Sequence, residues 1–156
     1  MRLSSMADYA VVTMCAAARH CGLRSAAGAR ISAGELARET GLPHPTVQKL
    51  VSMLVRGGLL TAMRGAGGGL QLARPAATIS LADIVEAVEG PIALTSCVEG
   101  ARQDCALEAS CSVRPHWGLV NEALRGALAG VPLTRLSAAP ELDRIAVHPQ
   151  LTEIPA

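Results

Sequence analysis

The stretch from Ile31 to Leu72 constrains the fold most, because strong helix-ending and turn signals divide it into four short elements. Ser32 followed three residues later by Glu35 is the pattern of a capping box, which predicts a helix that begins near residue 33. Gly41 tolerates the left-handed conformation that often ends a helix. Pro45 suits the first turn of a following helix, which should run to Gly57.

The second of these helices has one apolar face and is followed by a glycine-rich hairpin. Its apolar residues recur at helical spacing, at Val47, Leu50, Val51, Leu54 and Val55. Residues 59–64 and 70–73 are short apolar runs on either side of the turn 65–69, which predicts two antiparallel strands. Two helices joined by a tight turn and followed by a β-hairpin form a winged helix-turn-helix.

Three further helices are expected around this unit. Residues 6–21 have Tyr9, Val12, Thr13, Ala16 and Ala17 on one face of a first helix. Ser80 and Asp83 mark the start of another, which Gly90-Pro91 ends. A last amphipathic helix should begin at residue 115 or 116 and end at Gly130, and Leu133 and Leu136 would extend its apolar stripe beyond Pro132. The fold class is therefore mainly α with a small β-wing.

The composition indicates the cellular compartment and the residue types that form the core. Hydrophobic residues make up 50% of the 156 residues but aromatics only 1%, so Ala, Leu, Val, Ile and Met must form the core. We find neither an apolar run long enough to span a membrane nor a signal-peptide pattern, so we expect a cytoplasmic chain. In that compartment the five cysteines are expected to be thiols, metal ligands or redox groups.

The small net charge conceals an asymmetry between the two halves of the chain. Residues 1–74 have a net charge of +6 and residues 75–156 a net charge of −5. The basic half coincides with the helix-turn-helix and wing, which is typical of a surface that binds double-stranded DNA, although a solvated basic face would have the same composition. The expected DNA-reading residues, each of which could instead be merely exposed, are His44, Thr46, Gln48, Lys49 and Arg64.

The stripe on the last helix predicts association with a second copy. It comprises Trp117, Val120, Leu124, Ala127 and Leu128. A dimerisation helix is our interpretation, because helix-turn-helix proteins usually meet a pseudo-palindromic operator as two-fold dimers. The alternative is that the stripe packs against the first helix of the same chain. The expected domains are a winged helix at 1–79, a sensor and dimerisation region at 80–136, and a flexible tail at 137–156.

Three cysteines lie close together between the fourth and fifth predicted helices. Cys97 and Cys105 are separated by seven residues, and Cys105 and Cys111 by five. Thiolates are preferred ligands of iron–sulfur clusters and zinc, but the closely paired cysteines of a structural zinc site are missing. A fourth ligand would come from His116, Asp104, Glu108 or Asp8 of the partner subunit. The alternative is three unrelated thiols, and Cys15 and Cys21 are interpreted as small apolar residues.

Residues 1 to about 136 resemble the IscR/NsrR-type (Rrf) winged-helix transcription regulators of bacteria. The matching motifs are Asp8-Tyr9-Ala10-Val11, Gly41-Leu42-Pro43, Arg64-Gly65-Ala66-Gly67-Gly68-Gly69, the run from Ile84 to Gly90, and the three cysteines followed by Trp117. The resemblance implies a homodimer, an iron–sulfur cluster on Cys97, Cys105 and Cys111, and cluster-dependent control of transcription. It also implies that the recognition helix enters the major groove and Arg64 the minor groove.

Within this family the chain looks most like the regulator of the SUF cluster-assembly operon, which it resembles in Cys105-Ala106-Leu107-Glu108 and in Arg114 followed by Trp117. It departs from IscR-like members in the wider spacing of the first two cysteines. It also has Arg114 where they have a histidine ligand. His116 or Asp8 of the partner subunit is then the expected fourth ligand.

The sequence therefore predicts a DNA-binding repressor controlled by an iron–sulfur cluster, with [2Fe–2S] favoured over [4Fe–4S]. A repressor that responds to nitric oxide or redox stress through the same cluster is the alternative. A cluster-carrying scaffold without DNA binding is a third possibility, against which the basic half and Arg64 argue. No catalytic constellation or phosphate loop occurs, so we expect neither an enzyme nor a small-molecule substrate, and no membrane partner.

Overall fold

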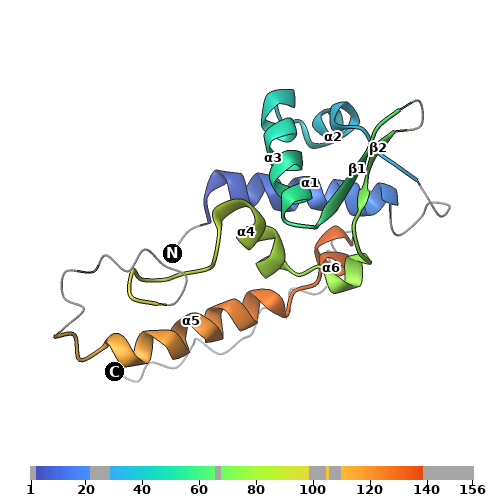
Figure 1. The fold of residues 1–156 in the computed structure, drawn as a ribbon. Helices are drawn as coiled ribbons and strands as arrows, with labels where there is room; N and C mark the ends of the chain where they lie inside the picture. Colours follow the sequence, from blue (N-terminus) through green and yellow to red (C-terminus); the bar gives the residue numbers. More distant parts are fainter. Residues whose placement is uncertain (1–2, 22–28, 66–67, 99–104, 106–109, 139–156) are drawn as a thin grey trace, which may run out of the picture.

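The computed structural model describes residues 3–21, 29–65, 68–98, 105 and 110–138, and within them it is mainly helical with one two-stranded sheet (Figure 1). The elements in chain order are α1 (Ser5–Cys21), α2 (Ala33–Thr40), α3 (His44–Arg56), β1 (Leu60–Met63), β2 (Gly69–Leu72), the short 3-10 helix η1 (Ala76–Thr78), α4 (Leu81–Glu89), α5 (Arg114–Ala129) and α6 (Leu133–Ser137). The mainly helical class with a small β-wing is confirmed.

The helix-turn-helix forms where the local signals place it. The hydroxyl of Ser32 accepts a hydrogen bond from the Glu35 amide at 3.1 Å, and the Glu35 carboxylate accepts one from the Ser32 amide at 2.8 Å. Gly41 ends α2 in the left-handed conformation, with φ 70°. The two helices therefore begin and end as predicted, because their caps depend only on neighbouring residues.

The wing is a two-stranded antiparallel ladder in which Leu60 pairs with Leu72 and Met63 with Gly69. The first strand is shorter than the predicted 59–64, and the second has the predicted length but begins one residue earlier, at Gly69. The Leu59 amide donates to the Leu54 carbonyl at 2.9 Å, so Leu59 still belongs to the turn that ends α3. Ile31 also pairs with Leu70 on the outer edge of β2, with N–O distances of 3.0 and 2.8 Å. The segment before α2 is thereby fixed to the wing.

The core is built around α1, which α2, α3, α4 and α6 contact. Its buried residues are Ala7, Ala10, Thr13, Met14, Cys15, Ala16, Ala17 and Ala18. Small side chains allow several helices to approach α1 closely, which suits a chain with almost no aromatic residues. The prediction for Thr13, Ala16 and Ala17 is confirmed. The prediction for Val12 is wrong, since its side chain is 39% exposed and the contacting helices cover the other sides of α1.

The α4 helix connects the winged helix to the C-terminal part of the chain. Its N-terminus has the expected capping box, in which the Ser80 amide donates to the Asp83 carboxylate at 2.7 Å. It contacts α1, α3 and α5. At the end of α3, a Cβ atom placed on Gly57 would lie only 2.7 Å from the Cβ of Ala87. The C-terminal end of α3 therefore contacts α4 directly, with no side chain from residue 57 between them.

The α5 helix lies beside α4, beyond the bundle that α1, α2 and α3 form (Figure 1). None of its residues is buried. The expectation that Leu133 extends the α5 stripe is wrong. Pro132 starts the separate helix α6, which packs on α1 and η1, and Leu133 is fully buried there with its amide 2.7 Å from the Ile79 carbonyl. The expected tail falls almost entirely outside the described residues.

Candidate nucleic-acid interface and cysteine segment

The α3 helix has one buried face and one exposed face. Val47, Leu50 and Leu54 are fully buried against the rest of the winged helix. On the opposite side, His44, Gln48 and Lys49 are exposed, and Thr46 is half-buried at the first turn. The packing therefore fixes the helix while the predicted reading residues stay accessible, as insertion into a major groove requires.

Arg64 is exposed at the end of β1, where the wing turns. Gly65 has φ 104°, and a Cβ atom on Gly68 would lie 2.5 Å from the Met63 carbonyl oxygen, so the turn needs glycine at both positions. The tight turn leaves Arg64 at the described edge of the wing. Residues 66–67 lie outside the described residues.

Two other arginines of the basic half form contacts within the protein. Arg19 on α1 binds the carboxylate of Glu39 on α2 at 2.8 Å, and His20 contacts the other oxygen of the same carboxylate. Arg74 forms an ion pair of 3.1 Å with Asp83 at the start of α4. These contacts hold the helices together, so the charge asymmetry alone overstates the number of arginines that face DNA.

The three clustered cysteines are partly exposed, and all five cysteines of the chain are free thiols. The Cys97 sulfur lies 3.2 Å from the Thr95 hydroxyl, and the Cys111 carbonyl accepts a hydrogen bond from the Arg114 amide at the start of α5. Across the described part of the chain, no three His, Cys, Asp or Glu side chains gather into a group that could hold a metal ion. The structure thus does not bring Cys97, Cys105 and Cys111 together as a preformed site.

Cys15 and Cys21 have a different environment. Cys15 is 8% exposed in the core, and burial raises the pKa of its thiol despite the nearby charge of Arg19. Burial also raises the pKa of Cys21, whose sulfur lies 3.6 Å from the Leu70 carbonyl oxygen. A raised thiol pKa disfavours the thiolate that binds metals, so both are poor ligands, in line with the sequence interpretation.

The candidate fourth ligands are separated in the structure. His116 is exposed in the first turn of α5, and Asp8 is exposed in the first turn of α1. Asp104 and Glu108 lie outside the described residues. Asp8 lies on α1, a different element from the cysteine segment. The resemblance implies that it would reach the cysteines from the partner subunit.

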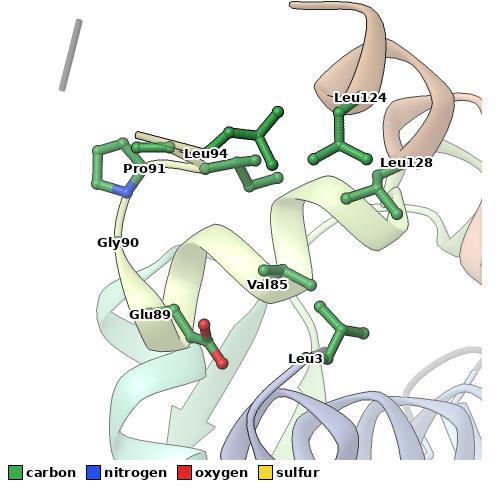
Figure 2. Close-up of a pocket in the computed structure, with 10 residues that line it drawn as sticks. Leu3, Val85, Glu89, Gly90, Pro91, Leu94, Leu124 and Leu128 are labelled. Carbon is green, nitrogen blue, oxygen red and sulfur yellow. The ribbon is translucent and has the colours of Figure 1, made fainter. Parts of the chain in front are cut away.

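The predicted dimerisation residues divide between two sides of α5. Leu124 and Leu128 line a cavity of about 300 Å³ between α4, α5 and the segment after α4, and they point toward Val85 and Leu94 (Figure 2). Trp117 is half-buried. Val120 is 48% exposed, and its neighbour Leu119, which the sequence analysis did not select, is 70% exposed.

Two polar residues of α5 have structural roles that were not predicted from the sequence. Asn121 binds the backbone of the segment after α4, and Arg125 forms a two-pronged ion pair with Glu86 at 2.7 and 2.9 Å. At the sequence level both look like the solvated face of an amphipathic helix. Nothing in their spacing identifies a partner almost thirty or forty residues away, so only the structure shows them.

The Glu86–Arg125 pair predicts a specific dependence of stability on pH. Hydrogen bonds from Arg125 hold the pKa of Glu86 below its ordinary value, against the opposite effect of partial burial. The stabilisation is therefore complete above the ordinary glutamate pKa, about 4.3, and is lost as the pH falls through the lower folded value. In urea unfolding between pH 7 and pH 3, Glu86→Gln should flatten this part of the profile. Arg125→Gln should flatten it equally, and an unchanged slope in both would contradict the assignment.

A helix-turn-helix with an exposed recognition helix face, followed by a β-hairpin wing whose turn contains glycines, is typical of DNA-binding transcription regulators. Residues 3–139 match the Rrf2 family, described as iron-dependent transcriptional regulators. The chain belongs to this family. No helix of the described residues is long and apolar enough to span a membrane.

Individual relatives agree with the family match. The chain is 35% identical over 128 residues to protein aau3 of Rhizobium meliloti, which covers 82% of this chain and 75% of that protein. It is 29% identical to the transcriptional regulator IscR of Photorhabdus laumondii, covering 87% and 79% of the two chains. Its fold resembles that of CymR, the global cysteine regulator of B. subtilis, with a TM-score of 0.65, 26% identity and coverage of 88% and 96%. The protein is therefore a transcription regulator rather than an enzyme, and its relatives imply that it binds DNA.

Proposed function

We propose that the protein is a homodimeric repressor whose affinity for its operator is controlled by an iron–sulfur cluster on Cys97, Cys105 and Cys111, and that it regulates SUF cluster-assembly genes. The carrying observation is that three partly exposed thiols lie in the segment next to α5, whereas Cys15 is buried in the core of the winged helix and the partly exposed Cys21 packs against that core. This segregation supports a cluster site outside the DNA-binding unit.

DNA reading in this proposal uses α3 and the wing. Gln48 can form two hydrogen bonds with adenine, and Lys49 can bind guanine or phosphate. Thr46 and His44 lie at the same end of α3, where base edges would be closest. Arg64 suits the narrow, electronegative minor groove of A·T-rich DNA.

Dimerisation through α5 is supported by the exposure of that helix. With no buried residue, α5 contacts α4 and the segment that follows α4, and much of its remaining surface is exposed among the residues that the structure describes. Val120 and Leu119 remain accessible and, with the half-buried Trp117, would form the apolar surface that a second copy covers, whereas Leu124 and Leu128 face α4 and would support this surface from the inner side of the helix. A two-fold dimer would place two recognition helices against the half-sites of a pseudo-palindromic operator.

The donor set fits an iron–sulfur cluster by chemistry, since three partly exposed free thiols are the ligands such clusters prefer. His116 or Asp8 of the partner subunit would complete the set, and we favour [2Fe–2S] over [4Fe–4S]. When bound, the cluster would supply a redox-sensitive centre. Because the three thiols are not gathered in advance, ligation would have to bring their sulfur atoms together. A coupling of about 1–3 kcal/mol would change operator affinity about 5- to 150-fold.

Anaerobic purification with iron and sulfide analysis and visible spectra tests this proposal. We expect a coloured wild type, a Cys105→Ala variant without cluster, and a Cys21→Ala control that keeps it. Operator binding should then differ between the loaded and cluster-free wild type. A colourless wild type under adequate cluster supply, or equal operator affinity of both forms, would contradict the proposal.

A further inference from the structure

One side chain fastens the segment that precedes Cys97 to α5. The carboxamide oxygen of Asn121 accepts a hydrogen bond from the Leu94 amide at 2.9 Å, and its nitrogen donates to the Ile92 carbonyl at 2.9 Å. Both halves of one amide are thus paired with backbone groups two residues apart. Asparagine has a low helix propensity. In the middle of α5, Asn121 is therefore stabilised more by these two hydrogen bonds than by its own preference for the helix.

Cys97 follows this attachment within a short turn. The Val98 amide donates to the Thr95 carbonyl at 3.4 Å, and Val98 is only 4% exposed. Val98 lines the same groove as Pro115 and Leu119 of α5. Cys97 is therefore anchored on one side by Asn121 and on the other by Val98, while the hydroxyl of Thr95 lies 3.2 Å from its sulfur.

The same helix also holds the other end of the cysteine segment. The Arg114 amide, in the first turn of α5, binds the Cys111 carbonyl at 3.3 Å. Cys97 and Cys111 are thus both tied to α5, one through a side chain in its middle and one through its N-terminal backbone. Both outer cysteines thus lie next to backbone attachments to the same helix.

We propose that Asn121 is a positioning residue that holds Cys97 against α5, and that the Thr95 hydroxyl donates a hydrogen bond to the Cys97 sulfur when this sulfur binds iron. The inference rests on the proposed cluster function. A ligating thiolate has no proton to give, so the hydroxyl must be the donor in that state. Hydrogen bonds to cluster sulfurs favour the reduced form by stabilising its extra negative charge.

The positioning role is tested first in the cluster-free protein. In Asn121→Leu, which is close in size but has no polar group, exchange of the Leu94 amide hydrogen should become about three- to tenfold faster. Alkylation of Cys97 by iodoacetamide, resolved by mass spectrometry, should accelerate by a similar factor. Cys105 should react as in the wild type, because Asn121 does not hold it. Asn121→Asp keeps an oxygen that accepts from the Leu94 amide, so this amide should stay protected from hydrogen exchange. This variant replaces Asn121→Leu in the measurement if the leucine variant does not fold.

Two outcomes in the cluster-free protein would overturn the positioning role. One is unchanged exchange of the Leu94 amide in Asn121→Leu. The other is equal acceleration of Cys97 and Cys105, which would indicate general loosening of the segment rather than release of one cysteine.

The loaded protein tests the consequence for the cluster. Asn121→Leu should release iron to a chelator about tenfold faster than the wild type, as expected when the support of a metal ligand is removed. Thr95→Val should shift the reduction potential to more negative values, and Thr95→Ser, which keeps the hydroxyl, should restore it. Unchanged release and an unchanged potential would overturn the inference. A wild type that binds no cluster would instead overturn the proposed function, and the cluster-free measurements would still decide whether Asn121 positions Cys97.

Discussion

Arg64→Ala is expected to weaken binding to an A·T-rich operator by about tenfold or more without changing the stability of the fold. Arg64 is exposed at the wing, so its removal leaves no buried group unpaired. Its charge would be lost where the minor-groove potential is most negative. Fluorescence anisotropy with labelled duplexes at several salt concentrations measures this effect and separates groove reading from phosphate contact.

Arg19→Ala is the matched control, because it removes the same charge from an arginine that is bound to Glu39 between α1 and α2. It should leave operator affinity within about twofold of the wild type, because the charge of Arg19 is already paired with that of Glu39. Equal losses in both variants would show that Arg64 contributes only to the general charge of the domain. A loss that is the same on A·T-rich and G·C-rich duplexes would restrict Arg64 to phosphate binding.

Leu133→Ala should lower the free energy of unfolding by about 2–5 kcal/mol, because the substitution leaves a cavity at a fully buried position. Leu133 belongs to the same apolar core as Met14 and Ile79. Urea unfolding followed by circular dichroism provides the measurement. It should be repeated at two protein concentrations, so that a change in folding is distinguished from a change in association.

The neighbouring Leu136→Ala provides a comparison on the same short helix, where the side chain is only half-buried and the loss should be smaller. A Leu133→Ala variant that unfolds like the wild type but associates more weakly would restore the sequence-based interpretation, in which this residue continues the stripe of α5. The result thus decides whether α6 belongs to the core of the protomer or to its surface.

The helix-turn-helix could be predicted because its signals are local. Ser32, Glu35 and Gly41 determine the ends of α2 through contacts within a few residues. The position of α6 could not be predicted in this way. It depends on Pro132, which immediately precedes the first residue of α6, and on the pairing of the Leu133 amide with the Ile79 carbonyl, more than fifty residues earlier in the chain.

The candidate site divides in the same manner. Residue type and spacing identified Cys97, Cys105 and Cys111 as possible ligands, and the start of α3 and Arg64 as possible DNA contacts, and these roles stay predictions. Spacing did not indicate that Asn121 and Arg125 attach α5 to its neighbours, since both pairs join distant parts of the chain. Nor did it indicate that the three sulfurs lie apart in the described structure.

The contact between Gly57 and Ala87 limits how a protomer can adapt to DNA. Because a side chain at residue 57 would meet Ala87, the end of α3 packs closely on α4, and we expect the two helices to move together. We therefore expect little hinge motion directly behind the recognition helix. In the proposed dimer, an operator with altered half-site spacing would have to be matched by reorienting whole protomers about α5, so tolerance to spacing would be decided at the dimer axis. Enlarging residue 57 would be one way to separate the two helices and to relax that constraint.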